Sequence, residues 1–295
     1  HHQGWRGIAV LPVVGMDARA KAVRQAEAVI ERTRRMLRER NLGDYSQVVI
    51  EPLGAEATYG AHARAGAVAS REVICKIAVE HEDKRGVEIF TREVNSPMTS
   101  MSPGSTGWFG GKPATMPVVK LFSFAYPKRD VTVTVSIDGK TERVQIPTEG
   151  GFEAAKIERP QVAPPAARPR DTVEVPLIRL AWGRSGDKGD KFNVGLIARK
   201  PDYLPWIRAA LTEQAVRDWF AHCFAGAKAP RVERFDLPGL DALNFLCHEA
   251  LGGGGTASLR LDPLAKGMAQ QLLEFPVPVP RELALRDGLT EARAA

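Results

Sequence analysis

The sequence predicts an α/β segment followed by an α+β domain. The chain has 295 residues, of which 44% are hydrophobic, and this is enough for two domains that each bury a core. Strand-like and helix-like runs alternate along the first half, as they do in α/β layers. A stretch rich in Pro, Ala and Gly at residues 148–171 has the composition of a linker. We therefore expect the domain boundary there.

The first segment, residues 1–147, contains the clearest helical pattern of the chain. Apolar side chains recur on one helical face, Asp17 precedes them as the expected N-cap, and residues 41–43 supply a stop signal, so we expect a helix over residues 17–40. The apolar face consists of Val23, Ala26, Ile30 and Leu37. The remaining pattern predicts strands at residues 7–11, 48–50 and 73–79, a helix around residues 87–94, a large loop at residues 95–117, and strands at residues 118–125, 131–137 and 141–146, the last two joined by an Asp-Gly hairpin turn.

The second domain, residues 172–280, has the element order of a split α+β sandwich of the ferredoxin-like kind, followed by a tail at residues 281–295. A strand at residues 175–182 leads into a glycine-rich loop, and a second strand covers residues 192–198. The later pattern predicts helical segments within residues 203–224, the second of them capped by Thr212, strands at residues 232–237, 242–251 and 258–261, a helix at residues 263–274, and an edge strand at residues 275–280.

Composition excludes several classes of protein. No run approaches 18 uninterrupted apolar residues, so the sequence predicts no membrane span. The net charge of +6 is compatible with an anionic small molecule but is spread too thinly for a nucleic-acid groove. Three cysteines, an odd number, do not form a disulfide framework, so a reducing, cytoplasmic location is expected.

The start of the chain also informs the expected partners. It opens on His1-His2 and runs at once into a strand, without an initiator Met or a signal-peptide pattern. The two histidines are either native or the remnant of a tag. We expect a fragment, or a chain whose upstream part is missing. We also expect a homo-oligomer or a companion chain, because an opening apolar strand leaves sheet edges uncovered.

The strongest chemical candidate is the charged, glycine-punctuated loop at residues 183–191. Its glycines let backbone approach a ligand, its N–H groups can form an anion nest, and its basic side chains supply the charge that a phosphate requires. Its two aspartates are candidates for general acid and base, or for Mg²⁺ ligands. The alternative is two consecutive turns whose aspartates bond their own backbone. The candidate residues are Arg184, Ser185 and Lys188 for substrate or phosphate binding, and Asp187 and Asp190 for catalysis.

The second candidate is the run of four glycines and a threonine at residues 252–256. Each glycine costs roughly 0.5–1 kcal/mol of conformational entropy relative to alanine, so close backbone approach is expected there. Its N–H groups can bind a phosphate or a thioester carbonyl, and Asn244 can donate to an oxyanion as a catalytic group. A wide β-bulge or a subunit contact explains the glycines equally well. The candidate binding residues are Gly252, Gly253, Gly254, Gly255 and Thr256.

The two glycine-rich segments are most useful together. Both permit backbone to come close to a bound molecule. We therefore expect them to lie within about 10 Å of each other, and the loop at residues 183–191 to line a pocket at a strand end.

Other patterns point away from familiar sites. The loop at residues 102–113 is similar to a phosphate-binding P-loop but lacks its first glycine and its Ser or Thr, so a lid or an oligomer contact is favoured. The pairs His222-Cys223 and Cys247-His248 lack the spacing of zinc ligands, and no metal site is expected. No dinucleotide-binding fingerprint is present, which argues against a redox step with NAD.

A set of motifs is shared with a known family. In the second domain they are residues 184–190 (RSGDKGD), 193–199 (NVGLIAR), 203–206 (YLPW), 237–240 (LPGL), 244–246 (NFL) and 251–260 (LGGGGTASLR). In the first segment they are residues 15–21 (GMDARAK), 88–90 (EIF), 100–107 (SMSPGSTG) and 118–124 (VVKLFSF). Together they resemble the acyclic terpene utilisation AtuA family, the second domain being similar to its ferredoxin-like C-terminal domain. Members of that family are longer, with an α/β region upstream.

The resemblance implies a place in pathways that degrade terpenoid and branched acids as coenzyme A thioesters. We expect an enzyme of acyclic terpenoid or branched-chain acid catabolism that acts on an acyl-CoA, as a lyase or hydratase or by acyl transfer. Its partner is then a small-molecule acyl-CoA, with CoA entering as part of the substrate, and no other cofactor is assigned. The alternative is a non-catalytic assembly or small-molecule-binding module.

Overall fold

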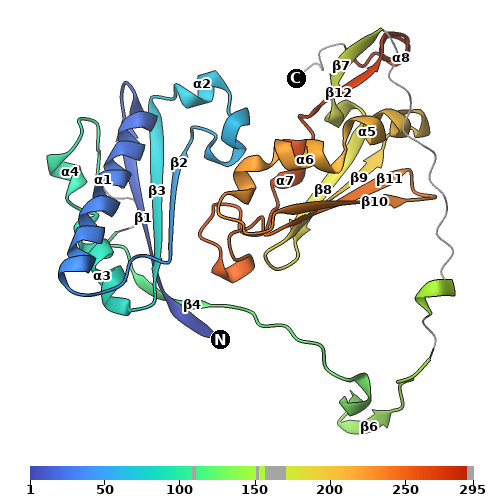
Figure 1. The fold of residues 1–295 in the computed structure, drawn as a ribbon, viewed down its shortest axis with the longest axis horizontal. Helices are drawn as coiled ribbons and strands as arrows, with labels where there is room; N and C mark the ends of the chain where they lie inside the picture. Colours follow the sequence, from blue (N-terminus) through green and yellow to red (C-terminus); the bar gives the residue numbers. More distant parts are fainter. Residues whose placement is uncertain (108–110, 151–152, 157–170, 291–295) are drawn as a thin grey trace. The chain divides into compact units, whose positions relative to one another are not determined.

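The computed structural model describes residues 1–107, 111–150, 153–156 and 171–290 (Figure 1). The chain forms two compact units, the larger made of His1–Lys120 and Pro164–Ala295 and the smaller of Leu121–Ala163. The larger unit holds residues 1–120 of the predicted first segment and the predicted second domain, whereas residues 121–147 of the first segment belong to the smaller unit. Most of the predicted linker at residues 148–171 lies outside the described residues. Within the described part of the chain, no helix is long and apolar enough to cross a membrane.

The first domain is a four-stranded sheet covered on one side by helices α1 and α3 (Figure 1). Its bounds are β1 His2–Val14, α1 Ala18–Glu39, β2 Gln47–Leu53, β3 Glu72–His81, α3 Lys84–Glu93 and β4 Thr115–Val119. The strand order is β2-β3-β1-β4, and all neighbouring strands are antiparallel. Each strand-helix-strand connection skips one position in the sheet, and the skipped position is filled by an antiparallel strand. The predicted alternation of strands and helices therefore produces an antiparallel sheet. This is the split βαββαβ arrangement of ferredoxin-like folds.

Shorter elements fill the connections of the first domain. They are the 3-10 helix η1 Ala57–His62 and the helices α2 Ala65–Val68 and α4 Pro97–Ser100. The loop predicted at residues 95–117 is irregular in its described part apart from α4 and the start of β4. It is tied to β1, because Val14 N–H donates to Gly104 O at 2.8 Å and Ser105 forms a β-bridge with Val13.

Helix α1 lies close to its predicted bounds, but the expected N-cap was wrong. Asp17 has a φ of 56°, a left-handed conformation instead of the extended one that an N-cap needs, and its side chain makes no capping hydrogen bond. Asn41, with a φ of 52°, follows the helix end as the sequence predicts. Of the predicted apolar face, Ala26, Ile30 and Leu37 are buried and Val23 is half-buried.

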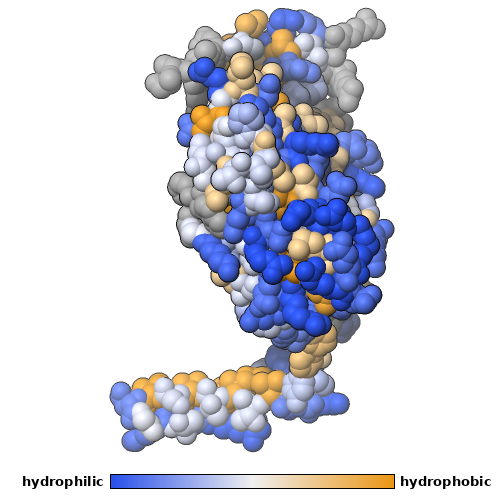
Figure 2. Space-filling view, turned by 90° about the vertical axis from the view of Figure 1, so that its left-hand side faces the viewer, coloured by the Kyte–Doolittle hydropathy of each residue, from blue (hydrophilic) through white to orange (hydrophobic). Residues whose placement is uncertain are grey.

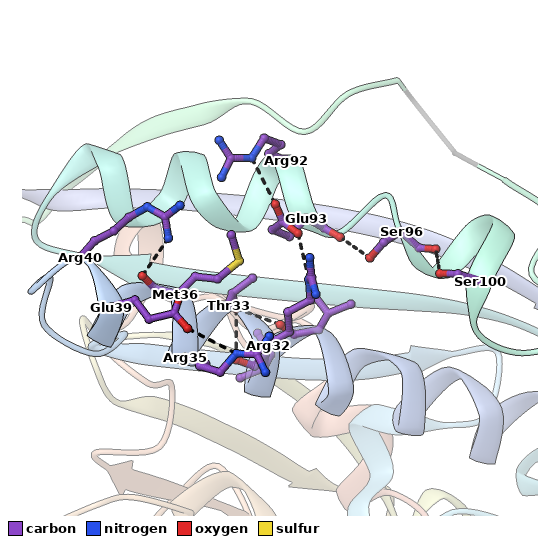
Figure 3. Close-up of polar contacts among 12 residues, drawn as sticks. Arg32, Thr33, Arg35, Met36, Glu39, Arg40, Arg92, Glu93, Ser96 and Ser100 are labelled. Atoms are coloured by element: carbon purple, nitrogen blue, oxygen red, sulfur yellow. Dashed lines mark hydrogen bonds and ion pairs between the residues drawn. The ribbon is translucent and has the colours of Figure 1, made fainter.

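One ion pair joins α1 to α3, and a second, within α3, shares its carboxylate (Figure 3). Arg32 Nε of α1 lies 2.9 Å from Glu93 Oε2 of α3, and Arg92 Nε lies 3.2 Å from Glu93 Oε1. Burial acts to raise the pKa of Glu93, but the hydrogen bonds from the two arginines outweigh it and lower that pKa. Helix α3 has a side-chain N-cap, because Asp83 Oδ1 accepts the Arg85 N–H at 2.8 Å.

The second domain also has a four-stranded antiparallel sheet, in the order β10-β11-β9-β8, with helices packed on one face. Its bounds are β8 Ala181–Asp187, β9 Phe192–Ala198, α5 Leu204–Ala210, α6 Glu213–Trp219, β10 Arg231–Leu237, β11 Ala242–His248 and α7 Met268–Leu272. In a ferredoxin-like βαββαβ fold that begins with β9, the last strand of the chain would pair with the free edge of β9. Here β8, which comes before β9 in the chain, pairs with that edge. The domain is thus a circularly rearranged ferredoxin-like fold.

Strands outside this sheet close the second domain. After α7 the chain forms β12 Pro276–Pro280, which pairs with β7 Thr172–Pro176 in a separate two-stranded sheet. Helix α8 Arg281–Arg286 follows, so the predicted tail begins as a helix. Short 3-10 helices are η4 Leu177–Arg179, η5 Pro201–Tyr203, η6 Ala221–Phe224 and η7 Gly255–Ala257.

Several predicted boundaries in this domain need correction. Thr212 caps α6 as predicted, because its Oγ1 accepts the Ala215 N–H at 3.0 Å. The predicted strand at residues 258–261 was wrong, since polar groups of this segment bond to side chains of the first domain instead of to a strand. The helix expected at residues 263–274 starts only at Met268, because the preceding residues form a turn.

The smaller unit contains an antiparallel hairpin of β5 Val133–Ile137 and β6 Lys140–Val144, besides η2 Lys128–Asp130 and η3 Ala154–Lys156. Asp138 and Gly139 have φ angles of 50° and 78°, which confirms the predicted Asp-Gly hairpin turn. No residue between 121 and 150 is buried. Figure 2 shows apolar residues gathered along one side of this hairpin.

Candidate functional site

The face of the first sheet opposite α1 and α3 carries two buried ion pairs. Arg6 Nη2 lies 2.9 Å from Glu80 Oε1, and Lys76 Nζ lies 2.6 Å from Glu51 Oε2, with no side chain of the four more than 12% exposed. Burial raises the pKa of Glu80, although Arg6 acts to lower it. Buried charges are costly unless further hydrogen bonds satisfy them, so this face needs a second layer of polar groups.

The second domain supplies that layer with residues 256–261, which follow the glycine tract. The two basic side chains of the sheet donate to main-chain carbonyls of this segment, and a carboxylate of the sheet accepts one of its N–H groups. The contacts are Arg6 Nη2 to Ala257 O at 3.1 Å, Lys76 Nζ to Leu259 O at 2.5 Å, and Leu261 N–H to Glu51 Oε1 at 3.0 Å. The segment therefore lies against the sheet through polar contacts.

The glycine tract itself is fixed to both domains. On the first domain, Gln47 Nε2 donates to Gly252 O at 3.3 Å, and Thr256 Oγ1 donates to Val119 O at 2.8 Å. On the second domain, Asp190 Oδ1 accepts the N–H of Gly253 at 2.8 Å and that of Leu251, just before the tract, at 3.2 Å. The tract thus bridges the two sheets.

The two glycine-rich segments are in direct contact, which confirms their predicted proximity. A Cβ placed on Gly254 would lie 2.1 Å from Gly189 O and 2.7 Å from Asp190 N. Gly254 has φ 70° and ψ 159°, a conformation open essentially to glycine alone. The glycine therefore allows the tract to cross the turn between β8 and β9.

A cleft of about 910 Å³ opens beside this crossing, within the larger unit. It is lined by strand β2, by residues around η6, by the glycine tract and by the turn that precedes α7. The titratable side chains along it are Glu51, Asp190, His222, Lys228, Glu249, Arg260 and Asp262. The volume is in the range of pockets that hold small organic ligands.

The carboxylates of the cleft already bind backbone N–H groups. Asp190 Oδ1 holds the glycine tract, and Glu249 Oε2 accepts the N–H groups of residues 228 and 229 at 2.8 and 3.1 Å. Those two hydrogen bonds hold the pKa of Glu249 below its ordinary value. Asp262 binds the N–H groups of residues 266 and 267 at 2.8 and 2.7 Å. These carboxylates shape the walls of the cleft.

Arg260 is the half-buried cation of the cleft, and sequence reasoning missed it. Among the ion pairs of the described residues, none involves its guanidinium. One of its N–H groups donates to Ala250 O, which leaves further donors on a rigid planar group. A Cβ on Gly252 would lie 3.3 Å from Arg260 Nε, so the guanidinium packs against the backbone of the tract. Arginine in this setting suits a carboxylate or a phosphate.

His222 was considered only as part of a zinc pair, and the structure gives it a different environment. Its Nε2 lies 2.9 Å from Thr58 O, and because a carbonyl only accepts, Nε2 carries the proton and Nδ1 the lone pair. Burial lowers the pKa of His222, so the ring is neutral at neutral pH. Gly60, with a φ of 56°, packs against the ring, where a Cβ would lie 2.4 Å from His222 Cγ.

Of the residues predicted from the sequence, the cleft brings together Asp190, Gly252 and Gly253. Gly254, Gly255 and Thr256 continue the tract beyond its lining. Arg184, Ser185, Asp187, Lys188 and Asn244 are not part of the lining. Ser185 is buried, and its Oγ donates to Ala265 O at 2.6 Å and accepts the Ala269 N–H at 2.8 Å.

The rest of the predicted charged loop is mostly strand. Residues 184–187 belong to β8, and only residues 188–191 form the turn, closed by the Lys188 N–H donating to Lys191 O at 2.7 Å. Arg184 and Lys188 are exposed. Asn244 Oδ1 accepts Asn193 Nδ2 at 2.9 Å on the sheet face that carries no helices. In the described residues no group of three or more His, Cys, Asp or Glu side chains is placed to hold a metal ion.

The architecture defines a class of protein: two ferredoxin-like layers whose sheets are bridged by a glycine tract, with a cleft beside the bridge. Comparison with protein families gives two matches, the acyclic terpene utilisation family protein AtuA over residues 1–137 and the AtuA ferredoxin-like domain over residues 175–278. The chain belongs to the AtuA family. No curated protein and no solved structure matches it.

Proposed function

We propose that this protein acts in acyclic terpenoid or branched-chain acid catabolism and that its cleft binds an acyl-CoA. The family name points to terpene utilisation. The observation that carries the proposal is Arg260, a half-buried guanidinium in a cleft whose carboxylates already bind backbone N–H groups. A carboxylate, phosphate or polarised thioester carbonyl of the substrate is the partner that fits this cation.

The glycine tract strengthens this proposal at the reacting end of the substrate. Gly252 lines the cleft beside Arg260, and its N–H donates no hydrogen bond to the described part of the chain. An N–H group and a guanidinium that converge on one oxygen stabilise an enolate or an oxyanion. This arrangement suits addition, elimination or acyl transfer at a thioester.

Proton transfer in this proposal falls to groups that line the cleft. Of the two aspartates predicted from the sequence, only Asp190 does so. His222 adds a neutral imidazole to the lining, hydrogen-bonded through Nε2 to Thr58 O and also to the side chain of Gln271, so it can exchange a proton only by giving up one of these bonds. Asp187, Lys188 and Asn244 lie outside the lining and take no part in the proton transfer proposed here.

The second candidate is a binding module without catalysis. It is favoured by the same carboxylates, because Asp190, Glu249 and Asp262 each accept backbone N–H groups and so have a structural task. In that case the cleft retains ligand affinity through Arg260, and no variant shows turnover because the parent has none.

Calorimetric titration and steady-state kinetics with branched acyl-CoA thioesters test the proposal. Replacing Arg260 by Gln removes a charge-assisted hydrogen bond, so we expect the Kd to rise about 10–100-fold. The matched control is Arg217→Gln, an exposed arginine of α6, for which Kd stays unchanged. Equal affinity in the parent and in Arg260→Gln contradicts the proposed binding site.

The catalytic part has its own pair of variants. Asp190→Asn keeps a hydrogen-bond acceptor for the glycine tract, but an amide cannot take up and release a proton as a carboxyl group does. The kcat is therefore expected to fall about 10²–10⁴-fold. Asp187→Asn is the control, with kcat near that of the parent. Unchanged kcat in Asp190→Asn removes this residue from catalysis. Saturable binding without turnover in the parent favours the binding module.

A further inference from the structure

The second sheet has one face that the helices of its domain leave open, and this face is apolar at one end. Trp182, Ile197, Phe235 and Leu237 lie on it with exposed fractions of 54%, 50%, 46% and 39%. The β10–β11 turn adds Leu240, which is 63% exposed. Apolar side chains gathered on one surface in this way mark an interaction site.

The strand register arranges this face in three rows that run across all four strands. Each row is given from β8 through β9 and β11 to β10. The first row is Trp182, Ile197, Ala242 and Leu237, the second is Arg184, Gly195, Asn244 and Phe235, and the third is Gly186, Asn193, Leu246 and Glu233. Within each row a small residue lies beside a larger one, Ala242 beside Ile197, Gly195 beside Asn244 and Gly186 beside Asn193, whereas Trp182 and Leu237 at the two ends of the first row are both large.

We propose that a second copy of this chain packs on the open face, related by a two-fold axis parallel to the strands. Such an axis lays β8 over β10 of the other copy, and β9 over β11, row upon row. Trp182 then meets Leu237, and Ile197 meets the small Ala242. In the second row Asn244 meets Gly195, which has no side chain. The face is therefore complementary to itself in size.

The charges on the face are compatible with the same axis, in which Arg184 of the other copy joins Glu233. Within its own chain this carboxylate already pairs with Arg231 at 3.3 Å and bonds His248 Nε2. Arg184 lies at the β8 edge and Glu233 at the β10 edge, one row apart, with Phe235 between Glu233 and the first row. The proposed axis brings Arg184 of one copy over Phe235 of the other, with Glu233 within reach of its long side chain, and does so twice by symmetry. A two-fold axis across the strands would lay each strand over itself and keep these opposite charges apart.

The size of the face sets the strength of the contact. Strands of seven residues and a sheet of four strands give a face of roughly 19 by 23 Å, hence on the order of 1,000 Å² buried by the two copies together. This is at the lower end of specific interfaces, which suits a reversible dimer. The proposal also gives a task to Arg184 and Asn244, which do not line the cleft.

Size-exclusion chromatography with light scattering tests the proposal on the full chain. The protein concentration is raised stepwise to about 100 µM. The parent is expected to pass from monomer to dimer across this range. Ile197→Glu places a charge in the apolar first row of the face and is expected to weaken the dimer at least about tenfold. Leu285→Glu is the control, because Leu285 is 69% exposed on α8, outside the sheet, and its dimer is expected to match that of the parent.

Charge reversal tests the axis. Arg184→Glu alone is expected to weaken the dimer. The double variant Arg184→Glu with Glu233→Arg is expected to dimerise more tightly than Glu233→Arg alone, which serves as the reference because it already loses the bonds of Glu233 to Arg231 and His248. Circular dichroism verifies folding of each variant. A parent that stays monomeric, whether its face is open or covered by its own hairpin, overturns the proposal. So does a dimer that survives Ile197→Glu, or a charge reversal that restores nothing.

Discussion

The crossing of the glycine tract over the β8–β9 turn can be tested by adding one methyl group. Gly254→Ala would put a Cβ 2.1 Å from Gly189 O and 2.4 Å from Gly189 C. These are backbone atoms, which cannot move aside as a flexible side chain can. The tract or the turn must therefore shift, and the hydrogen bonds of Asp190 to the tract shift with it.

The magnitude follows from two costs. The conformation of Gly254, φ 70° and ψ 159°, costs a residue with a Cβ about 1–3 kcal/mol. Overpacking against the turn adds about 1–3 kcal/mol. We thus expect a loss of about 2–6 kcal/mol in the free energy of unfolding, offset by less than about 1 kcal/mol from the stiffer unfolded chain.

Gly255→Ala is the matched control within the same tract. Gly255 also has a positive φ, 43°, but its Cβ would have no heavy atom within 4 Å. Only the backbone cost of about 1–2 kcal/mol applies to it. Thermal unfolding of the two variants is therefore expected to differ by several degrees, at about 2–4 °C per kcal/mol. Equal melting temperatures for the two variants would refute the packing described for Gly254.

Three further predictions concern charge. Glu80→Ala leaves Arg6 buried without its partner, so urea unfolding is expected to show a loss of about 3–5 kcal/mol, and a loss under about 1 kcal/mol would mean that the pair is solvated. Burial lowers the pKa of His222, so below about pH 6.5 the proton binds only to the unfolded chain, and the free energy of unfolding of the parent is expected to fall with the pH. His222→Asn is expected to lack this pH dependence. Asp83 has its pKa lowered to about 2 by hydrogen bonds from Arg85, so the stability gap between the parent and Asp83→Ala is expected to be present above the ordinary pKa of 3.8 and to close toward pH 2. A gap that stays constant with pH would show that the charge of Asp83 is irrelevant to it.

Local patterns in the sequence predicted much of the fold. The helical face of α1, the Thr212 cap and the Asp-Gly turn each depend on residues a few positions apart, and the structure contains all three. The errors arose where distant groups decide. Residues 258–261 look like a strand, but their backbone bonds to Lys76 and Glu51 of the first domain. Nothing local in the sequence encodes that contact.

The residues of the candidate site likewise fall into those that local sequence patterns predicted and those that they did not. The glycines and Asp190 were found because backbone close to backbone demands glycine, and a turn favours aspartate. Arg260 and His222 were missed as site residues, since neither belongs to a recognised spacing and they meet only in the folded chain. One available signal was Arg260 itself, a charged residue four positions after the tract, between Leu259 and Leu261. Arg184, which the sequence suggested for substrate binding, lies on β8 and does not line the cleft, because charge alone does not show which face a strand presents.

The most direct test of the central claim is a crystal structure of the protein with a branched acyl-CoA. The account predicts difference density in the cleft beside the glycine tract, with a negatively charged or carbonyl oxygen of the ligand bonded to Arg260. It also predicts that no ligand density lies on the sheet face that carries Arg184 and Asn244. Ligand density on that face, with the cleft filled only by solvent at saturating ligand, would contradict the assignment of the cleft as the binding site.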